Sequence, residues 1–226
     1  MEPIRQDKLG FILTVFRTDG IHPDTAVSNP LECLRGLIVS RHAHCNSGNA
    51  SIKERLLQVV QSHNSESADS GEIISPVIPK KTGHRNVSTL NLLLDWTRAN
   101  FGEYSLNSMK TWTDDQIIQR MLKIKGIGLC TVTTMLCDSL GRDILPVNAA
   151  VLRIFSRTGV SGRFGSYYRL FRSVNSVIPY GKSRFLYRNL IEFGRQTCMV
   201  RQPACIRCPF GEICDYYCRK NDWCMS

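Results

Sequence analysis

Four cysteines near the carboxyl end are the feature that most restricts what this chain can fold into. They form the spacing C-x6-C-x2-C-x5-C and are Cys198, Cys205, Cys208 and Cys214. Four thiolates within seventeen residues can enclose one metal centre. Such a set suits either tetrahedral zinc or a [4Fe–4S] cluster. Zinc fingers usually show two C-x2-C pairs and this stretch has one, so the spacing leaves both metals open.

The remaining cysteines and the start of the chain bear on the redox compartment. Ten cysteines would indicate disulfides in a secreted protein. Met1-Glu2-Pro3 lacks the basic and apolar regions of a secretion signal, so we expect an intracellular metal site instead. Cys218 and Cys224 are plain thiols, alternative ligands or a disulfide. No apolar run approaches the ~18 residues of a membrane helix, so we expect no membrane association.

The stretch from Leu122 to Leu140 predicts two apolar helices joined by a glycine turn. Apolar residues recur at helical spacing on both sides of Lys125-Gly126-Ile127-Gly128. Two glycines permit positive φ and close backbone approach. The amides around Gly126, Gly128 and Cys130 would then open a helix, and N–H groups at a helix start bind anions such as a DNA phosphate. An ordinary helix–turn–helix without a ligand is the alternative interpretation.

Charge along the chain is uneven. Residues 1–113 hold 12 Lys and Arg against 11 Asp and Glu, whereas residues 114–226 hold 17 against 8. The second part therefore carries most of the formal net charge of +10. A basic half suits a polyanionic partner, with charge for solubility as the alternative.

Helical periodicity without a convincing period-two strand predicts an all-α chain of about ten helices. Thr113 and Gln116 fit a capping box, and Asn29 and Asn148 fit helix N-caps. Further predictions are a helix over 50–61 and a polar loop over 62–71. A length of 226 residues allows one large domain or two small ones.

Three groups of residues together resemble the endonuclease III branch of the helix-hairpin-helix DNA glycosylases. They are Gly194-Arg195-x-Thr197-Cys198 running into the cysteine stretch, Asn29-Pro30-Leu31-Glu32 before a helix ending in Ser40-Arg41-His42-Ala43, and Lys125-Gly126-Ile127-Gly128 followed by Pro146-Val147-Asn148. Their order covers nearly the whole chain. The resemblance implies a two-domain, all-α fold: a six-helix barrel over 25–145, with the hairpin at 114–140, and an iron–sulfur cluster domain built from 1–24 and 146–226.

The resemblance also implies a DNA interface. Double-stranded DNA would lie between the two domains of a monomer, with a damaged or modified base extruded into a pocket. The four cysteines would hold a [4Fe–4S] cluster whose loop presents Arg201 and Arg207 to phosphates. His42, beside Arg41, and His84 map to the positions of side chains that fill the gap left by the base. Plain surface histidines are the alternative for both.

The chain departs from the family at both catalytic positions. Cys130 stands where bifunctional members carry a nucleophilic lysine, and a thiol cannot form a Schiff base. Asn148 replaces the aspartate that stabilises the oxocarbenium-like sugar or activates water. Leu37 stands near the acidic residue of adenine-removing relatives. These changes predict no lyase activity through position 130 and doubtful base removal.

Three functions fit these residues. The first is a DNA-binding member of the family that recognises damaged or modified bases without the family's chemistry. The second is an active monofunctional glycosylase with a displaced acid, for which Asp143 is the candidate. The third is a zinc-stabilised interaction module with no role on DNA.

Overall fold

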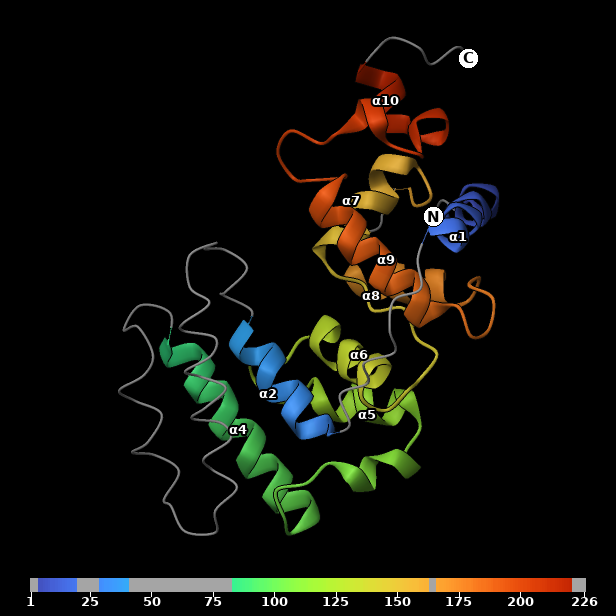
Figure 1. Cartoon of the computed structure of the whole chain (residues 1–226). Coiled ribbons are helices and arrows are strands. Elements are labelled where there is room, and N and C mark those ends of the chain that lie inside the picture. The colour runs from blue at the N-terminus through green and yellow to red at the C-terminus, as the bar shows by residue number, and fades with distance from the viewer. Residues whose placement is uncertain (1–3, 20–28, 41–82, 163–165, 221–226) are drawn as a thin grey trace. The chain divides into compact units, whose positions relative to one another are not determined.

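The structure is a computed structural model that describes residues 4–19, 29–40, 83–162 and 166–220 (Figure 1). The described residues form helices and connecting turns with no strand, which confirms the all-α prediction. The α-helices are α1 (Gln6–Asp19), α2 (Pro30–Ser40), α4 (Gly83–Phe101), α5 (Asp114–Met121), α6 (Leu129–Asp138), α7 (Ala149–Thr158), α8 (Tyr167–Asn175), α9 (Ser183–Gln196) and α10 (Asp215–Lys220). Short 3-10 turns are η2 (Asn107–Thr111), η3 (Cys205–Arg207) and η4 (Gly211–Ile213).

Several predictions concern residues outside the described part. These are the helix over 50–61, the loop over 62–71, and the individual residues Arg41, His42 and Cys224. Among the helices that the structure describes, none has the length and apolar character needed to cross a bilayer.

Contacts divide the chain into two compact units, residues 26–142 and residues 1–25 joined with 143–226. The first unit holds α2, α4, α5 and α6, and the second holds α1, α7, α8, α9 and α10 (Figure 1). The assignment of a six-helix barrel and a cluster domain, with boundaries after 24 and 145, stays a prediction.

In the unit of residues 26–142, α6 packs against both α2 and α5, and α2 also packs against α4. Every residue of α6 from Thr131 to Cys137 is buried, because the helix is covered on more than one side. The predicted capping box is present: Thr113 Oγ1 accepts from the Gln116 amide at 3.3 Å, and Gln116 Oε1 accepts from the Thr113 amide at 3.0 Å. This box fixes where α5 starts, and therefore where the glycine turn follows it.

In the other unit, α7 packs against α9 and α10, and α1 packs against α9. Three aromatic rings join these elements to the cysteine loop. The ring centroid of Phe16 in α1 lies 5.9 Å from that of Phe193 in α9. The centroid of Phe210, in the loop, lies 5.3 Å from Phe16 and 4.7 Å from Phe193. Aromatic pairs at such centroid distances add stability beyond the area they bury. The N-terminal helix and the cysteine loop therefore share one core.

A buried lysine also attaches α1 to the cysteine loop. The Lys8 side chain is 8% exposed, and its Nζ donates to the Thr158 carbonyl at 2.8 Å and the Ile213 carbonyl at 2.6 Å. It forms an ion pair with Asp215 as well. A buried ammonium needs several acceptors to offset its loss of water. Here the acceptors are the end of α7 and the two residues flanking Cys214.

Candidate nucleic-acid interface and cysteine pocket

The predicted hairpin is present between α5 and α6. Gly126 has φ +92°, a left-handed conformation that side chains rarely adopt. Ile124 and Ile127 are each 5% exposed and anchor the turn, whereas Lys125 between them is exposed. Gly128 is the N-cap of α6 and has no side chain to accept a hydrogen bond from the first turn. The N-cap residue therefore supplies no side-chain acceptor to the positive end of this helix.

Helix α4 packs against the glycine turn through Thr89. A Cβ added to Gly126 would lie 2.1 Å from Thr89 Oγ1, so the backbone of the turn rests on a threonine side chain. Thr89 is 8% exposed, so the groups around it enclose its side chain. Close approach, as well as positive φ, therefore requires glycine at position 126. Sequence reasoning missed Thr89, because its contact with the turn is tertiary.

Cys130 and Asn148 occupy ordinary structural environments. The Cys130 sulfur, half-buried in α6, lies 4.0 Å from Thr134 Oγ1. Asn148 caps α7 as predicted, since its Oδ1 accepts from the amides of Ala150 and Val151, each at 2.9 Å. A thiol and an uncharged amide supply neither an amine nucleophile nor a carboxylate.

Asp143 caps a helix from outside it. Its carboxylate accepts from the Gly181 amide and, at 3.1 Å, from the amide of Ser183, the first residue of α9. Lys182 at the N-cap position supplies no side-chain acceptor, so Asp143 takes over that function. Both carboxylate oxygens are engaged with backbone amides, which gives this residue a structural role beside the catalytic one considered from sequence.

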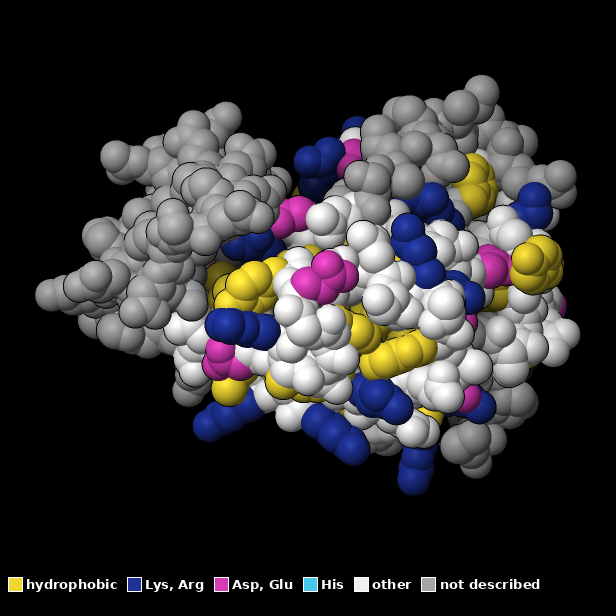
Figure 2. All heavy atoms as spheres, turned by 90° about the horizontal axis from the view of Figure 1, so that it is seen from below, with side chains coloured by type: hydrophobic (Ala, Val, Ile, Leu, Met, Phe, Trp, Pro, Cys, Tyr) yellow, Lys and Arg dark blue, Asp and Glu magenta, His cyan; other side chains and the backbone are white. Residues whose placement is uncertain are grey.

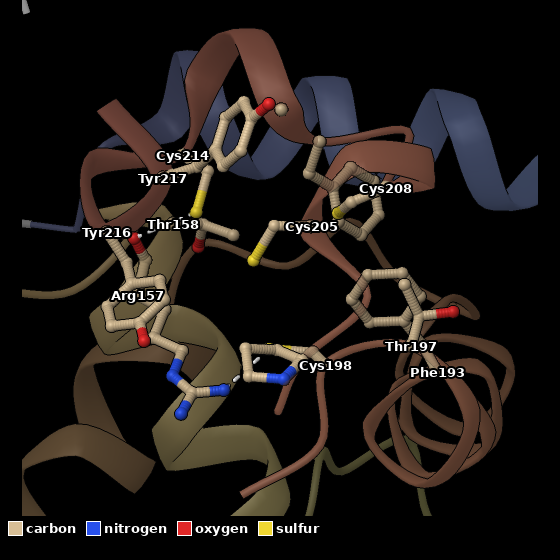
Figure 3. A pocket seen from close by; sticks show the side chains of 13 residues that line it. Arg157, Thr158, Phe193, Thr197, Cys198, Cys205, Cys208, Cys214, Tyr216 and Tyr217 are labelled. Atoms are coloured by element: carbon tan, nitrogen blue, oxygen red, sulfur yellow. Dashed lines mark hydrogen bonds between the residues drawn. The ribbon is translucent and has the colours of Figure 1, made fainter. Parts of the chain in front are cut away.

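The four cysteines of the predicted metal site line one pocket (Figure 3). Cys198 follows α9, Cys205 opens η3, and Cys208 and Cys214 follow η3 and η4. Burial raises the pKa of Cys208 to about 11; a hydrogen bond from the Phe210 backbone opposes this, and the other three cysteines add to it. Burial likewise raises the pKa of Cys214. Thiolates gathered here would need a cationic centre to compensate their charge.

Arg157 of α7 links two of these cysteines. Its Nη1 donates to Cys198 Sγ at 3.5 Å and to the Met199 carbonyl at 2.6 Å, and its own carbonyl accepts from Cys214 Sγ at 3.3 Å. Its guanidinium also lies 4.7 Å from the centre of the Tyr216 ring. One turn earlier, Arg153 Nε donates to the Cys198 carbonyl at 2.9 Å. Sequence reasoning missed both arginines. The available signal was that they lie four residues apart in the helix that Asn148 caps.

Among the described residues, no three His, Cys, Asp or Glu side chains are close enough together to hold a single metal ion. Cys218 lies in α10 as a free thiol. The structure therefore places the four cysteines around one pocket without choosing between the metals considered from sequence.

The residues predicted to contact DNA lie as follows in the described part of the chain. Arg201 and Arg207 are exposed on the cysteine loop, and His84 lies in the first turn of α4 with its side chain outside the described part. Figure 2 shows more Lys and Arg than Asp and Glu side chains on one face. The structure describes each unit separately, so it does not test whether these residues share one interface.

The chain is similar in sequence to known DNA glycosylases and endonuclease III proteins. No family model matches the chain. It is 27% identical over 105 residues to a thymine/uracil-DNA glycosylase of Methanothermobacter thermautotrophicus, covering 43% of this chain and 45% of that protein. It is 24% identical over 211 residues to endonuclease III of Haemophilus influenzae, a match that covers 91% of this chain and 93% of that protein. The match to the first relative thus spans less than half of that protein's length.

The fold has a counterpart among solved structures. A trapped endonuclease III–DNA covalent intermediate aligns with a TM-score of 0.70 at 15% identity, over 96% of this chain and 98% of that one. At this identity the likeness shows the fold. It extends through both compact units, which between them contain the glycine hairpin and the cysteine pocket.

Proposed function

We propose that this chain, which belongs to the endonuclease III-like branch of the helix-hairpin-helix DNA glycosylase superfamily, binds double-stranded DNA at damaged or modified bases as an intracellular, monomeric repair protein. The observation that carries the proposal is the hairpin. Gly126 at φ +92° and the absence of a side-chain cap at Gly128 suit the approach of a phosphate to α6. Exposed Lys125, Arg201 and Arg207 add cationic contacts.

Recognition without the family's chemistry is the form of this function that the residues support best. Cys130 offers a half-buried thiol where an amine would be needed, and Asn148 offers a capping amide where a carboxylate would be needed. Asp143 uses both carboxylate oxygens to hold backbone amides. We therefore place DNA binding ahead of base removal.

A titration tests the proposal directly. We expect the protein to bind a duplex with an abasic-site analogue more tightly than the same duplex intact, with affinity that falls steeply with salt. Fluorescence anisotropy at several salt concentrations measures both properties. Equal affinity for the two duplexes would contradict damage recognition, and binding that is insensitive to salt would contradict phosphate contacts.

The same proposal includes a [4Fe–4S] cluster in the cysteine pocket, held by Cys198, Cys205, Cys208 and Cys214. Four sulfur donors, with no His or carboxylate among them, suit iron–sulfur chemistry. When bound, the cluster would cross-link the loop through iron–thiolate bonds. The chain's own part is to orient the donors, and the Arg157 N–H directed at Cys198 Sγ stabilises negative charge on that sulfur.

Replacing one cysteine of the proposed cluster site gives a prediction that can be followed by colour. We expect the purified protein to be brown, with absorbance near ~400 nm, and Cys208→Ser to lose most of that absorbance because one ligand is gone. Cys218→Ser is the matched control, since it removes a free thiol of α10 outside the ligand set. A colourless protein containing zinc would instead support the zinc alternative.

Restoring the family carboxylate gives a second prediction. Asp caps helices as well as Asn does, so Asn148→Asp should fold normally. We expect base removal to rise by at least about 100-fold, because a charge returns beside the developing cation. Alkali-revealed strand breaks on a panel of lesion duplexes measure it.

The control is Asp143→Asn. Wild-type protein that already removes bases, and loses this activity with Asp143→Asn, would favour the displaced-acid alternative. An Asn148→Asp protein that binds the lesion duplex but remains inactive would show that more than the carboxylate has been lost.

A further inference from the structure

Helix α8 presents an aromatic and basic face that the proposed function does not use. Leu170, Phe171 and Val174 are buried and attach the helix to its unit. On the opposite side, Tyr168 is 48% exposed, and Arg169 and Arg172 are exposed. Positions 168 and 172 are four residues apart and so share one face of the helix. We call Tyr168, Arg169 and Arg172 the α8 face.

The sequence around the α8 face contains no acidic residue. Positions 144–191 include eight Lys and Arg and not one Asp or Glu. The adjoining loop adds Tyr180, which is 94% exposed, and Lys182. The carboxylate of Asp143 reaches this loop from outside the window, where it accepts from the backbone amides of Gly181 and Ser183. The charge of this region suits a polyanion.

We propose that the α8 face binds single-stranded nucleic acid, with a base stacked on Tyr168 and phosphates paired with Arg169 and Arg172. Aromatic rings among cationic side chains bind single strands because each unpaired base offers a face for stacking. In a duplex the bases are stacked on one another, and a surface tyrosine gains little. An acidic peptide would use the arginines without needing the ring. The α8 face belongs to the unit of residues 1–25 and 143–226 and the hairpin to that of residues 26–142, and the inference does not depend on the proposed duplex function.

The test is the binding of a fluorescein-labelled, mixed-sequence single-stranded oligonucleotide to the full chain. We expect Tyr168→Ala to weaken binding about tenfold and Tyr168→Phe to leave it nearly unchanged, because phenylalanine keeps the stacking ring. The double change Arg169→Gln with Arg172→Gln should make the salt dependence shallower by about 1.4 in the log–log slope, for two lost phosphate contacts.

Matched controls come from the other unit. The control variants are Tyr104→Ala and Arg98→Gln. Tyr104 is 52% exposed, and Arg98 is exposed on α4. Tyr168 also contacts Phe171, with ring centroids 6.4 Å apart. Tyr168→Leu therefore keeps apolar bulk at that contact, and thermal unfolding checks that each variant is folded. Binding losses as large in Tyr104→Ala as in Tyr168→Ala would overturn the proposal.

A hairpin variant separates this site from the proposed function. Gly126→Ala should weaken duplex binding and leave single-strand binding intact. Single-strand affinity unchanged by all the α8 variants would overturn the inference while leaving duplex recognition standing. If only the α8 variants lose single-strand binding, the inference is supported. If Gly126→Ala also leaves duplex affinity unchanged, the proposed role of the hairpin in duplex binding is contradicted.

Discussion

Replacing Gly126 with alanine is expected to weaken binding to duplex DNA at least tenfold and to destabilise the unit of residues 26–142 by about 2 kcal/mol or more. Two costs add at this position. The residue has φ +92°, where an L side chain is strained by roughly 1 kcal/mol. The new Cβ would also lie 2.1 Å from Thr89 Oγ1, so the turn must move off α4. Any such movement redirects the first turn of α6.

Two companion variants separate strain from collision. Gly102 has φ +74°, and nothing lies within 4 Å of a Cβ added there. Gly102→Ala therefore introduces backbone strain without a steric collision. Thr89→Ala removes the colliding Oγ1 and should rescue part of the loss when combined with Gly126→Ala. Chemical denaturation and duplex titration measure both effects. If Gly126→Ala behaved like Gly102→Ala in both assays, the support of the turn by Thr89 would be wrong.

This hairpin illustrates what the sequence could predict. The glycine pair, the capping box at Thr113 and the N-cap at Asn148 are local signals, because each depends on residues within one turn of chain. All three are present in the structure. Thr89, by contrast, precedes Gly126 by 37 residues, and no local pattern connects them.

The cysteine pocket shows the same limit. Spacing identified the four cysteines, which line one pocket. The groups that orient them come from distant segments: Arg157 from α7, and Lys8 from a helix more than 200 residues away from Ile213. From its charge, Asp143 is a candidate acid, whereas its hydrogen bonds to the Gly181 and Ser183 amides show that it caps α9. Side-chain chemistry was readable from the sequence, but partners that depend on tertiary packing were not.

Replacing Lys8 with methionine is expected to lower the free energy of unfolding by about 3 kcal/mol. Methionine has a similar length and no polar end, so it fills the space without replacing the donor. The change leaves the Thr158 and Ile213 carbonyls without their ammonium and Asp215 without its cation. Because Lys8 is 8% exposed, little water can take its place.

The pair can be isolated by a double-mutant cycle with Asp215→Asn, read by thermal unfolding. The coupling between Lys8 and Asp215 should exceed about 1 kcal/mol, since one partner is buried. The exposed pair Arg5–Asp7 serves as control. Its side chains are 53% and 72% exposed, and Arg5 Nη2 lies 4.0 Å from Asp7 Oδ2. Asp7→Asn should change stability by less than about 0.5 kcal/mol. A Lys8→Met protein as stable as Asp7→Asn would show that apolar packing holds α1 without the Lys8 contacts.

Lys8 also connects stability to the cysteine pocket, because two of its three acceptors flank Cys214. Without it, the end of the cysteine loop would lose its attachment to α1 and to the carboxyl end of α7. If the cysteine pocket holds the proposed cluster, we expect Lys8→Met to release it several-fold faster under a chelator, followed as the decay of absorbance near ~400 nm. Unchanged decay in a measurably destabilised protein would confine Lys8 to the packing of α1. Helix α7 is capped by Asn148 at its start, and its last residue, Thr158, accepts a hydrogen bond from Lys8. The contact with the buried lysine and the capping asparagine therefore lie at opposite ends of the same helix.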